Sequence, residues 1–528
     1  MRFVTQSVSG QFRRGPLVAL GFFLFVVVAG YQASQFILSG DTSGLILTAI
    51  FFIFVAVVVV MLNDWRRGLY FFLIWLLFED FARKFLGNNM AVYFGKDILV
   101  AVVYVSFFAA YRRKEVRTFR PPFLIPLLLL VWFGVMQVFN PASLSLSYGV
   151  LGLKLYFYYI PLMFVGYALF ETEGDLRRFF FIILLAGGVI ISLGIVQSIL
   201  GHTFLNPESP GEDIRELSQL YRVAPLSGVI AYRPTSVFVS AGRFANFLIL
   251  TWLLAFGFSG YLLLRHRSGR NLAFLSLSAA FAGVALSASR GVLLWVALSA
   301  IVGTVAFLWG SPWRHNAITR ILRTLQRAAI GACLALAILM ATYPEALLSR
   351  VAIYQETLSP NSTANEFVYR ARDYPVQNFL LAFTYDRWPY GFGIGTSSLG
   401  VQYVSRIMHV PPMGIGVENG YGVLVIEMGI VGLALWIIMS SAIVFTAWKV
   451  VRKLKESPWF PLGFMIFWYA FLLLFPLTFN GIAPYQDFVL NAFLWLLIGI
   501  LFRLPTMVLT PELAAPSSPD NQPRGRMR

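Results

Sequence analysis

The chain has 528 residues, of which 58% are hydrophobic, 16% aromatic and only 12% charged. Soluble globular domains carry about 25% charged residues, so the composition argues against a soluble globular protein. Disordered chains are rich in charge and poor in apolar residues, which excludes disorder as well. A formal net charge of +17 would suggest nucleic-acid binding in a soluble protein. Here its meaning depends on where the cations lie along the chain.

Long apolar runs indicate a membrane protein. A spanning helix needs about 20 mostly apolar residues, and the sequence contains fourteen candidates, of which the third is short and ends in Glu79 and Asp80. We therefore predict an all-α polytopic membrane protein with about 14 transmembrane helices (about 12–14). The segments lie near residues 17–38, 45–62, 68–82, 96–111, 122–139, 149–170, 179–200, 237–264, 272–289, 291–310, 328–343, 419–447, 459–478 and 485–502.

A single transmembrane domain is expected over residues 17–503. Residues 1–16 are basic and are followed by no small-residue cleavage site, so we expect a cytoplasmic tail and no cleaved signal peptide. The Pro/Ser/Arg-rich residues 504–528 are expected to form a disordered cytoplasmic tail. The single cysteine, Cys333, lies in an apolar run and can form no intramolecular disulfide.

The basic residues predict the orientation in the membrane. Twenty-seven of the 41 Lys and Arg residues fall in termini and short loops that share one side when the chain crosses fourteen times, and such loops are cytoplasmic. Both termini are then cytoplasmic, and two long segments, 201–236 and 344–418, lie outside. We predict helical stretches near 345–357 and 366–383 in the second. Long ordered loops on a rigid scaffold often carry function, so the active site is expected on this outer, periplasmic side.

Fourteen cations remain outside the cytoplasmic loops. Charge near the membrane interior is costly and marks functional sites, and guanidinium groups match phosphate geometry. Convergence of some of these cations on an anion at the outer leaflet, such as a polyprenyl pyrophosphate, is therefore favoured over snorkelling of each side chain to the interface. The fourteen are Arg83, Lys84, Lys96, Lys154, Arg215, Arg222, Arg233, Arg243, Arg290, Arg350, Arg370, Arg372, Arg387 and Arg406.

Four stretches between about residues 230 and 440 combine Arg, Ser, Gly and Asn in compact motifs. They are residues 232–238 (YRPTSVF), residues 287–291 (SASRG), Arg370 or Arg372 with residues 388–395 (WPYGFGIG), and residues 418–421 (ENGY) with 427–432 (EMGIVG). Together they resemble the O-antigen ligase and O-antigen polymerase family of bacterial membrane glycosyltransferases. In that family the corresponding motifs read Arg-x-(Thr/Ser)-(Ser/Gly)-x-Phe, Ser-x-Ser-Arg-(Gly/Ala), an Arg followed by Pro-x-x-Gly-x-Gly-x-Gly, and His-Asn-x-(Tyr/Phe) followed by Glu-x-Gly.

The resemblance implies transfer of glycan from undecaprenyl pyrophosphate to a hydroxyl group, with no nucleotide sugar and no metal. Direct displacement would invert the anomeric centre, and we expect no cofactor and no nucleic-acid partner. Arg290 and Arg370 or Arg372 would hold the pyrophosphate, and Arg233 would be a further member of this set. Supporting residues would be Ser287, Ser289, Arg243, Lys154, Asn419 and Tyr421.

The general base is where the chain departs from the family, which commonly has His at the position of Glu418. A carboxylate can also act as a base, and His409 lies nine residues earlier in the same segment. Both remain candidates. We interpret Glu427 as a buried structural acid. For the charges of residues 79–84 we expect a salt-bridged surface turn.

The predicted protein is a polysaccharide polymerase for O-antigen or exopolysaccharide in the bacterial inner membrane. Ligation to a lipid core or to protein is one alternative, a peptidoglycan-type polymerase is another, and a transporter or flippase of a lipid-linked anion is a third. Expected partners are the lipid-linked donor, a glycan or lipid-core acceptor, the bilayer, and chain-length regulators or export proteins. The glycines at 391, 393 and 395 are expected to form a tight turn, since no phosphate-loop Lys-Ser/Thr follows them.

Overall fold

The structure is a computed structural model that describes residues 42–86, 90–207, 219–265, 269–312, 315–358, 368–410 and 412–508. Nearly all of this part of the chain is helical. In chain order the elements are α2 (Thr42–Asn63), α3 (Trp65–Phe85), α4 (Met90–Arg112), α5 (Leu124–Val138), α6 (Leu146–Phe157), α7 (Leu162–Ala168), α8 (Glu173–Leu200), β1 (Tyr221–Val223), β2 (Ile230–Tyr232), α10 (Ala241–Arg265), α11 (Arg270–Leu286), α12 (Arg290–Gly310), α13 (His315–Thr342), α14 (Pro344–Leu358), η1 (Tyr369–Asp373), α16 (Tyr374–Leu381), η2 (Ala382–Thr384), α17 (Val401–Met408), α18 (Gly420–Lys453), α19 (Phe460–Leu472), η3 (Leu473–Leu477), α20 (Thr478–Asn480), α21 (Ala483–Gln486) and α22 (Phe488–Val508).

The all-α prediction is confirmed in its coarse form. A helix overlaps each predicted apolar segment except the one near 17–38, which lies outside the described residues, as do residues 1–16 and 509–528 of the predicted tails. Residues 504–508, which are predicted to belong to the disordered C-terminal tail, instead form the end of α22. By length and apolarity, eight helices of the described chain could cross a membrane, or nine if α13 and α14, bent by 116°, form one span. The fourteen crossings therefore stay a prediction.

The chain divides into two compact units. The first comprises residues 1–72 and 98–108. Within its described part, the rings of Trp65 and Phe107 lie 5.2 Å apart, and the Ser106 hydroxyl donates to the Leu62 carbonyl at 3.2 Å. The second unit comprises residues 73–97 and 109–528.

The core of the second unit consists of α10, α19 and α22. Nearly every side chain of α10 and α22 is buried, as expected for helices that are apolar on all faces. Small residues let the backbones approach closely. A Cβ atom on Gly499 of α22 would lie 2.0 Å from the Met163 carbonyl oxygen of α7.

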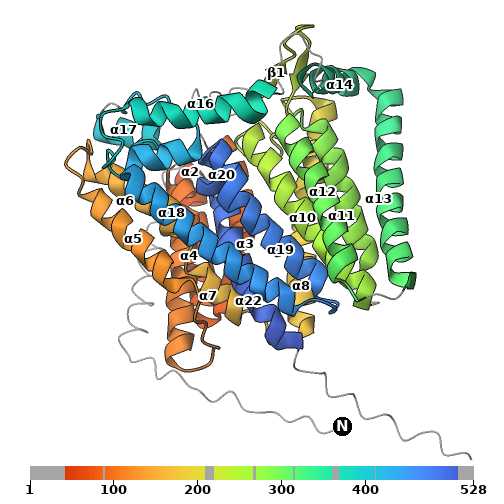
Figure 1. The fold of residues 1–528 in the computed structure, drawn as a ribbon, viewed down its shortest axis with the longest axis horizontal. Helices are drawn as coiled ribbons and strands as arrows, with labels where there is room; N and C mark the ends of the chain where they lie inside the picture. Colours follow the sequence, from red (N-terminus) through yellow and green to blue (C-terminus); the bar gives the residue numbers. More distant parts are fainter. Residues whose placement is uncertain are drawn as a thin grey trace, which may run out of the picture. The chain divides into compact units, whose positions relative to one another are not determined.

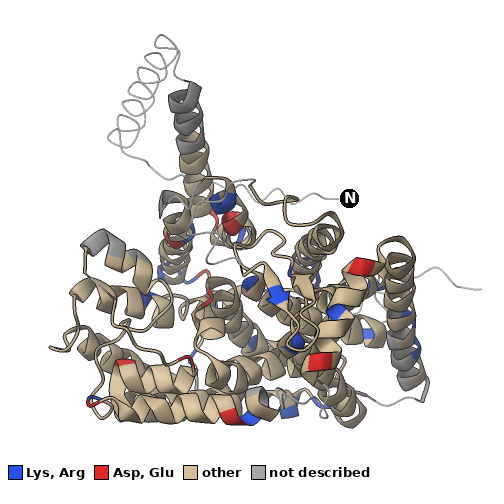
Figure 2. Cartoon of the chain, turned by 90° about the horizontal axis from the view of Figure 1, so that it is seen from above, with Lys and Arg blue, Asp and Glu red and all other residues tan. Residues whose placement is uncertain are grey.

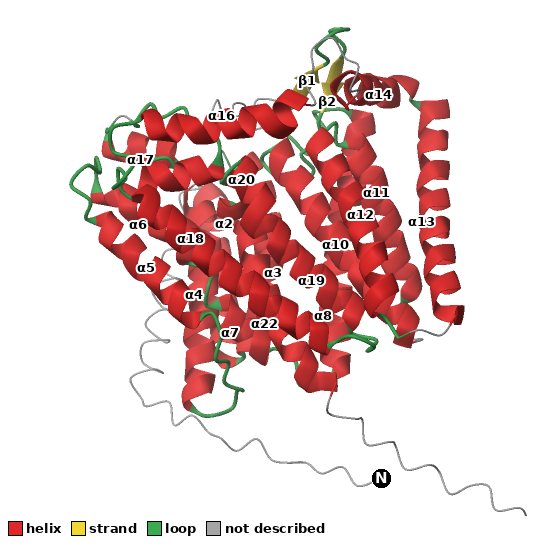
Figure 3. Cartoon of the chain, in the orientation of Figure 1, coloured by secondary structure: helices red, strands yellow, loops and turns green. Residues whose placement is uncertain are grey.

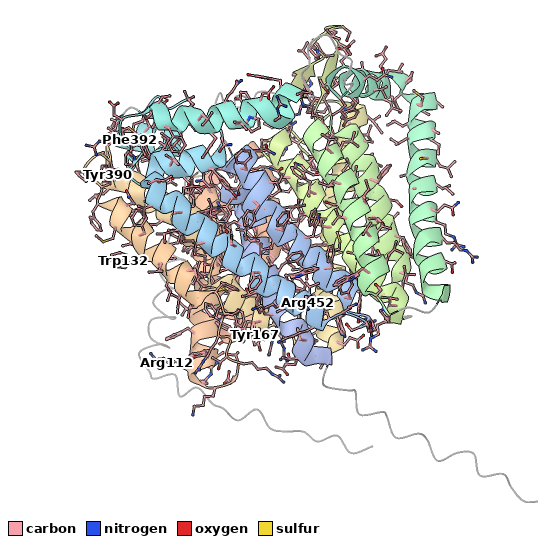
Figure 4. All side chains as sticks on the ribbon, in the orientation of Figure 1. Arg112, Trp132, Tyr167, Tyr390, Phe392 and Arg452 are labelled. Carbon is pink, nitrogen blue, oxygen red and sulfur yellow. The ribbon has the colours of Figure 1, made fainter. Side chains whose placement is uncertain are left out.

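One end of this unit carries the elements of both predicted outer segments. The hairpin β1–β2, α14, α16 and α17 all lie across this end of the long helices (Figures 1 and 3). The strands pair antiparallel, with Tyr221 opposite Tyr232, and this hairpin was not predicted. Arg112 and Arg452, which belong to predicted cytoplasmic loops, lie at the opposite end from Tyr390 and Phe392 (Figure 4). The arrangement agrees with the predicted orientation, and the assignment of this end to the outer face stays a prediction.

Candidate functional site

A cation-lined cavity of about 310 Å³ lies in the second unit. Four cations line it, and each comes from a different helix, because Arg83 ends α3, Lys96 belongs to α4, Lys154 to α6 and Arg243 to the first turn of α10. The remaining lining residues are Tyr93, Leu155, Tyr159, Gln219, Val239, Ser240, Gly242, Asn246, Leu399, Gly400, Ala483, Gln486, Asp487 and Phe488. Charged residues are otherwise scattered among uncharged helices (Figure 2).

Carboxylates hold two of these cations, the arginines, in place. The Arg243 Nη1 donates to both Asp80 oxygens, at 2.9 and 2.7 Å, and Arg83 Nη1 donates to Asp80 Oδ1 at 2.9 Å. The Arg243 Nε lies 3.4 Å from Asp487 Oδ2. Asp80 is 1% exposed and does not line the cavity, whereas Arg243 is 22% exposed. The guanidinium groups therefore stand between a buried carboxylate and the cavity.

The two lysines are held in the same way. Lys96 Nζ lies 3.1 Å from Glu79 Oε2, and Lys154 Nζ lies 2.6 Å from Asp97 Oδ2. The Tyr93 ring also faces both ammonium groups, at 3.4 and 4.5 Å from its centroid, a cation–π arrangement. Removing one partner of a buried ion pair leaves an uncompensated charge and costs about 3–5 kcal/mol, so the network fixes the direction in which each cation points.

The charges of residues 79–84 do not form the predicted surface turn. Glu79, Asp80, Arg83 and Lys84 are 0–3% exposed. The prediction was wrong because α4, α10 and the segment before α22 cover this end of α3 and supply its ion-pair partners. The Lys84 ammonium donates to Thr235 Oγ1 at 2.9 Å and to the Ser236 carbonyl at 2.6 Å.

The first resembling stretch leads the chain into α10 and so places Arg243. Ser236 has φ +52°, a conformation that non-glycine residues adopt rarely and mostly at functional or tightly constrained sites. Its backbone N–H and that of Thr235 both donate to Gln197 Oε1, at 2.7 and 2.8 Å. Arg233 is half-buried, and burial lowers its pKa below the usual value. Its Nη1 donates to the carbonyl of Gln219, a cavity-lining residue, at 3.5 Å.

The second stretch forms the turn between α11 and α12. Ala288 has φ +51°, and its carbonyl accepts a hydrogen bond from Arg222 Nη1 at 3.4 Å. Arg350 of α14 is buried and joins this turn to the first stretch, because it donates to the carbonyls of Leu286 (2.6 Å) and Tyr232 (2.8 Å). This role of Arg350 could not be predicted from the sequence, because its hydrogen-bond acceptors are main-chain oxygens.

Ser287 and Ser289, two of the predicted supporting residues, form hydrogen bonds within this turn. The Ser287 hydroxyl donates to the Val284 carbonyl at 2.8 Å and accepts from the Ser289 N–H at 3.2 Å. Ser289 is the N-cap residue of α12 but forms no side-chain cap, and Arg290, the first residue of α12, is half-buried. Neither serine nor Arg290 lines the cavity.

The third and fourth stretches pack against each other. The N–H groups of Phe392 and Gly393 donate to the Ile426 and Glu427 carbonyls, at 2.7 and 3.0 Å. Glu427 is 0% exposed, and its Oε1 accepts from Ser397 N–H and Ser398 Oγ, at 2.9 and 2.7 Å. Its interpretation as a buried structural acid is confirmed.

The glycine run forms the predicted turn, with positive φ at positions 391, 393 and 395. The turn lies against helix backbone, because a Cβ atom on Gly391 would lie 2.6 Å from the Glu427 carbonyl oxygen of α18. The next residues reach the cavity, where Leu399 N–H donates to Gln486 Oε1 at 2.8 Å. The cavity thus lies where the segments after the first and third stretches meet.

Gly395→Ala is expected to destabilise the protein by about 3 kcal/mol or more. Gly395 has φ +89°, and a Cβ atom there would lie 1.9 Å from the Tyr148 carbonyl oxygen. Thermal unfolding of the purified protein measures the effect. Gly414→Ala is the matched control, because no atom lies within 4 Å of the added Cβ. Equal melting temperatures for the two variants would contradict the packing described here.

The candidate bases lie apart from the cavity lining. Glu418 is exposed, and its Oε2 accepts a short hydrogen bond from the Tyr374 hydroxyl, while its N–H donates to Asn378 Oδ1 at 2.6 Å. His409 is the exposed C-cap residue of α17, with φ +52°. Among the described contacts, neither of the two candidate bases hydrogen bonds to the other.

Asn419 and Tyr421, which follow Glu418 in the sequence, lie at the N-terminus of α18. Asn419 is its N-cap, accepting from the Gly422 N–H at 2.9 Å and donating to the Pro375 carbonyl at 3.0 Å. The Tyr421 ring lies 5.5 Å from the Phe479 ring.

The two candidate arginines of the third stretch lie in η1. The Arg372 side chain is 78% exposed and its Nε lies 2.8 Å from Asp373 Oδ1. The side chain of Arg370 lies outside the described residues. Of the residues predicted to hold the pyrophosphate, Arg372, Arg290 and Arg233 do not line the cavity. Two of the predicted supporting residues, Arg243 and Lys154, do line it, and Arg233 donates to the lining residue Gln219.

Comparisons with family models, curated proteins and solved structures gave no match.

The cavity also contains Arg83, Lys96 and Asp487, to which sequence reasoning assigned no role. The sequence did contain one signal for Arg83 and Lys96, because both belong to the fourteen cations that lie outside the predicted cytoplasmic loops. Asp487 offered no such signal, because its partner Arg243 lies 244 residues earlier in the sequence.

Proposed function

We propose that this chain is a membrane glycosyltransferase that takes glycan from undecaprenyl pyrophosphate on the outer face of the bacterial inner membrane. The observation that carries the proposal is the cavity lined by Arg83, Lys96, Lys154 and Arg243. Its volume lies at the lower end of ordinary ligand sites, which measure about 300–1,000 Å³. Four cations that converge on one cavity suit an anion with more than one charge.

The arrangement of the ion pairs supports a pyrophosphate rather than a purely structural network. Three of the carboxylates, Glu79, Asp80 and Asp97, do not line the cavity, and only Asp487 does. A negative ligand would therefore meet mostly cations, already oriented by the acids behind them. Such preorganised charge stabilises the negative charge that develops on a leaving group.

In the proposed reaction, an acceptor hydroxyl oxygen forms a bond to the anomeric carbon while the bond from that carbon to the pyrophosphate oxygen breaks. The bonding electrons leave with the pyrophosphate, where Lys154 and Arg243 stabilise them. Direct displacement inverts the anomeric centre. The hydroxyl proton passes to Glu418, for which Tyr374 is the positioning residue. His409 is the other candidate for this role.

We propose polymerisation as the activity, with O-antigen or exopolysaccharide repeats as donor and acceptor. The test adds purified protein in detergent to undecaprenyl-pyrophosphate-linked repeats and follows the length of the lipid-linked glycan. Lengthening is expected, and no gradient exists in detergent to drive a transporter. Transfer to lipid core without lengthening would identify a ligase instead. If neither the lipid-linked donor nor the acceptor is consumed, the proposal is overturned.

A further inference from the structure

A second pocket, of about 500 Å³, lies at the N-terminal end of α11. It is bordered by α11, the C-terminal end of α10 and α13. Two arginines line it, Arg270 from the first residue of α11 and Arg327 from α13. Its apolar wall consists of Leu263, Phe274 and Leu275. The remaining described lining residues are Asn271 and Ser278.

The contact between α13 and α11 positions the two arginines. A Cβ atom on Gly331 of α13 would lie 3.9 Å from Ser278 Oγ of α11, and Ser278 also lines the pocket. Arg327 lies one helical turn before Gly331, and Arg270 lies about two turns before Ser278. Both cations therefore lie on the same side of this helix contact, toward the N-terminal ends of the two helices.

A membrane crossing by α11, as the sequence predicts near 272–289, would place this pocket at the membrane interface, although α11 belongs to the shorter apolar helices. α11 has 17 residues and is about 25 Å long, which is close to the roughly 30 Å thickness of the hydrocarbon core. Its first residue, Arg270, then lies near the level of the lipid headgroups. The chain just before α11 and the first half of α13 belong to predicted cytoplasmic segments rich in arginine.

The outer face of α13 has the character of a lipid-facing surface. Ile330, Leu334 and Ile338 are 49%, 60% and 65% exposed, and Leu275 in the pocket wall is 68% exposed. An apolar wall that ends in two cations matches one ligand shape, an acyl chain that ends in a phosphate.

We propose that this pocket binds an anionic phospholipid of the cytoplasmic leaflet. Arg270 and Arg327 hold the phosphate, and an acyl chain runs along Phe274 and Leu275. Basic pockets between transmembrane helices on the cytoplasmic side are suited to anionic headgroups. This site is independent of the proposed glycosyl transfer, because it shares no residue with the cation-lined cavity.

The test uses the full chain in detergent, where no membrane surface attracts basic residues in general. Native mass spectrometry counts bound phosphatidylglycerol and bound phosphatidylcholine. The double variant Arg270→Gln with Arg327→Gln is expected to weaken phosphatidylglycerol binding by roughly 100-fold or more, since each hydrogen bond to a charged phosphate contributes a factor of about 10 or more. Phosphatidylcholine binding should not change.

The matched control is Lys449→Gln with Arg452→Gln, which removes the same charge at the same end of the unit and outside the pocket. The control should bind phosphatidylglycerol as the unaltered chain does. Equal losses in both double variants, or no loss in either, would overturn the proposal. Inorganic phosphate is added in a separate arm, and displacement of the bound lipid by millimolar phosphate would show a free-anion site instead of a lipid site.

A measurement on the unaltered chain keeps the proposal testable if the double variant fails to fold. Photoactivatable phosphatidylglycerol, with the reactive group in its acyl chain, is crosslinked to the protein and the peptides are identified. Crosslinks are expected in residues 270–278 and on α13. Crosslinks confined to other helices would overturn the proposal.

Discussion

Lys154→Met is expected to lower kcat/KM for the lipid-linked donor by about 100-fold. A hydrogen bond to a charged group contributes about 1.5–3 kcal/mol, which corresponds to a factor of roughly 10–150. Lys154 faces the cavity and is 17% exposed, so its ammonium can reach a bound phosphate while it keeps its contact with Asp97. Initial rates at varied donor concentration measure the effect on the purified protein.

Asp97 separates a role in binding the donor from a role in the fold. Asp97→Asn removes the carboxylate 2.6 Å from Lys154 Nζ but leaves the cation. A smaller loss than that of Lys154→Met is therefore expected, because the ammonium is still present but is less well oriented. The double variant, Lys154→Met with Asp97→Asn, should be more thermally stable than Lys154→Met alone, because neither charge is left without its partner. It should stay as inactive as Lys154→Met. If Asp97→Asn lost as much activity as Lys154→Met, the ion pair itself would be what matters, and Lys154 would not contact the donor.

The sequence predicted the helices well because a membrane imposes a strong constraint on composition. A run of about 20 apolar residues has few alternatives to a helix in lipid, and each such run in the described chain coincides with helix. Breaks were harder to predict. The segment predicted near 149–170 is interrupted between α6 and α7, and α18 contains Gly429 at φ +68°. Hydropathy averages over about 19 residues, so a local change of backbone direction leaves little trace in it.

The site was predicted only in part, because its residues converge from distant parts of the chain. The sequence showed that Arg83, Lys96, Lys154 and Arg243 break the positive-inside pattern, but a linear pattern does not tell which of fourteen such cations share a cavity. The residues between 79 and 84 illustrate the difficulty. Alternating charges at a helix end are typical of an exposed turn, and only the packing of α4, α10 and the segment before α22 buries them.

The four stretches that carry the family resemblance supply few of the side chains that line the cavity. The Arg350 side chain links the first stretch to the end of α11 just before the second stretch, through the carbonyls of Tyr232 and Leu286. Main-chain hydrogen bonds join the third stretch to the fourth. Arg290 and Arg372 lie outside the cavity lining, whereas Arg243 and Lys154 lie within it. Proposed pyrophosphate contacts therefore rest on the cavity more firmly than on the motifs.

Glu418→Gln is expected to lower kcat by about 10²–10⁴-fold, the range for loss of a general base, with little change in the donor KM. The amide oxygen of Gln can still accept the hydrogen bond from Tyr374, and the site is exposed, so the fold should persist. The variant thus removes the proton acceptor and little else. Single-turnover rates of glycan transfer, with thermal unfolding alongside, measure the effect.

His409→Ala and Tyr374→Phe decide how such a loss is interpreted. His409→Ala should keep full activity if Glu418 is the base, because the histidine is an exposed helix C-cap with no hydrogen bond to Glu418. Tyr374→Phe should cause a smaller loss than Glu418→Gln, since a positioning residue only narrows the orientations of the carboxylate. An active Glu418→Gln together with an inactive His409→Ala would transfer the role of base to His409. Full activity in both would remove both residues from the mechanism, because the acceptor proton would then have to leave by another route.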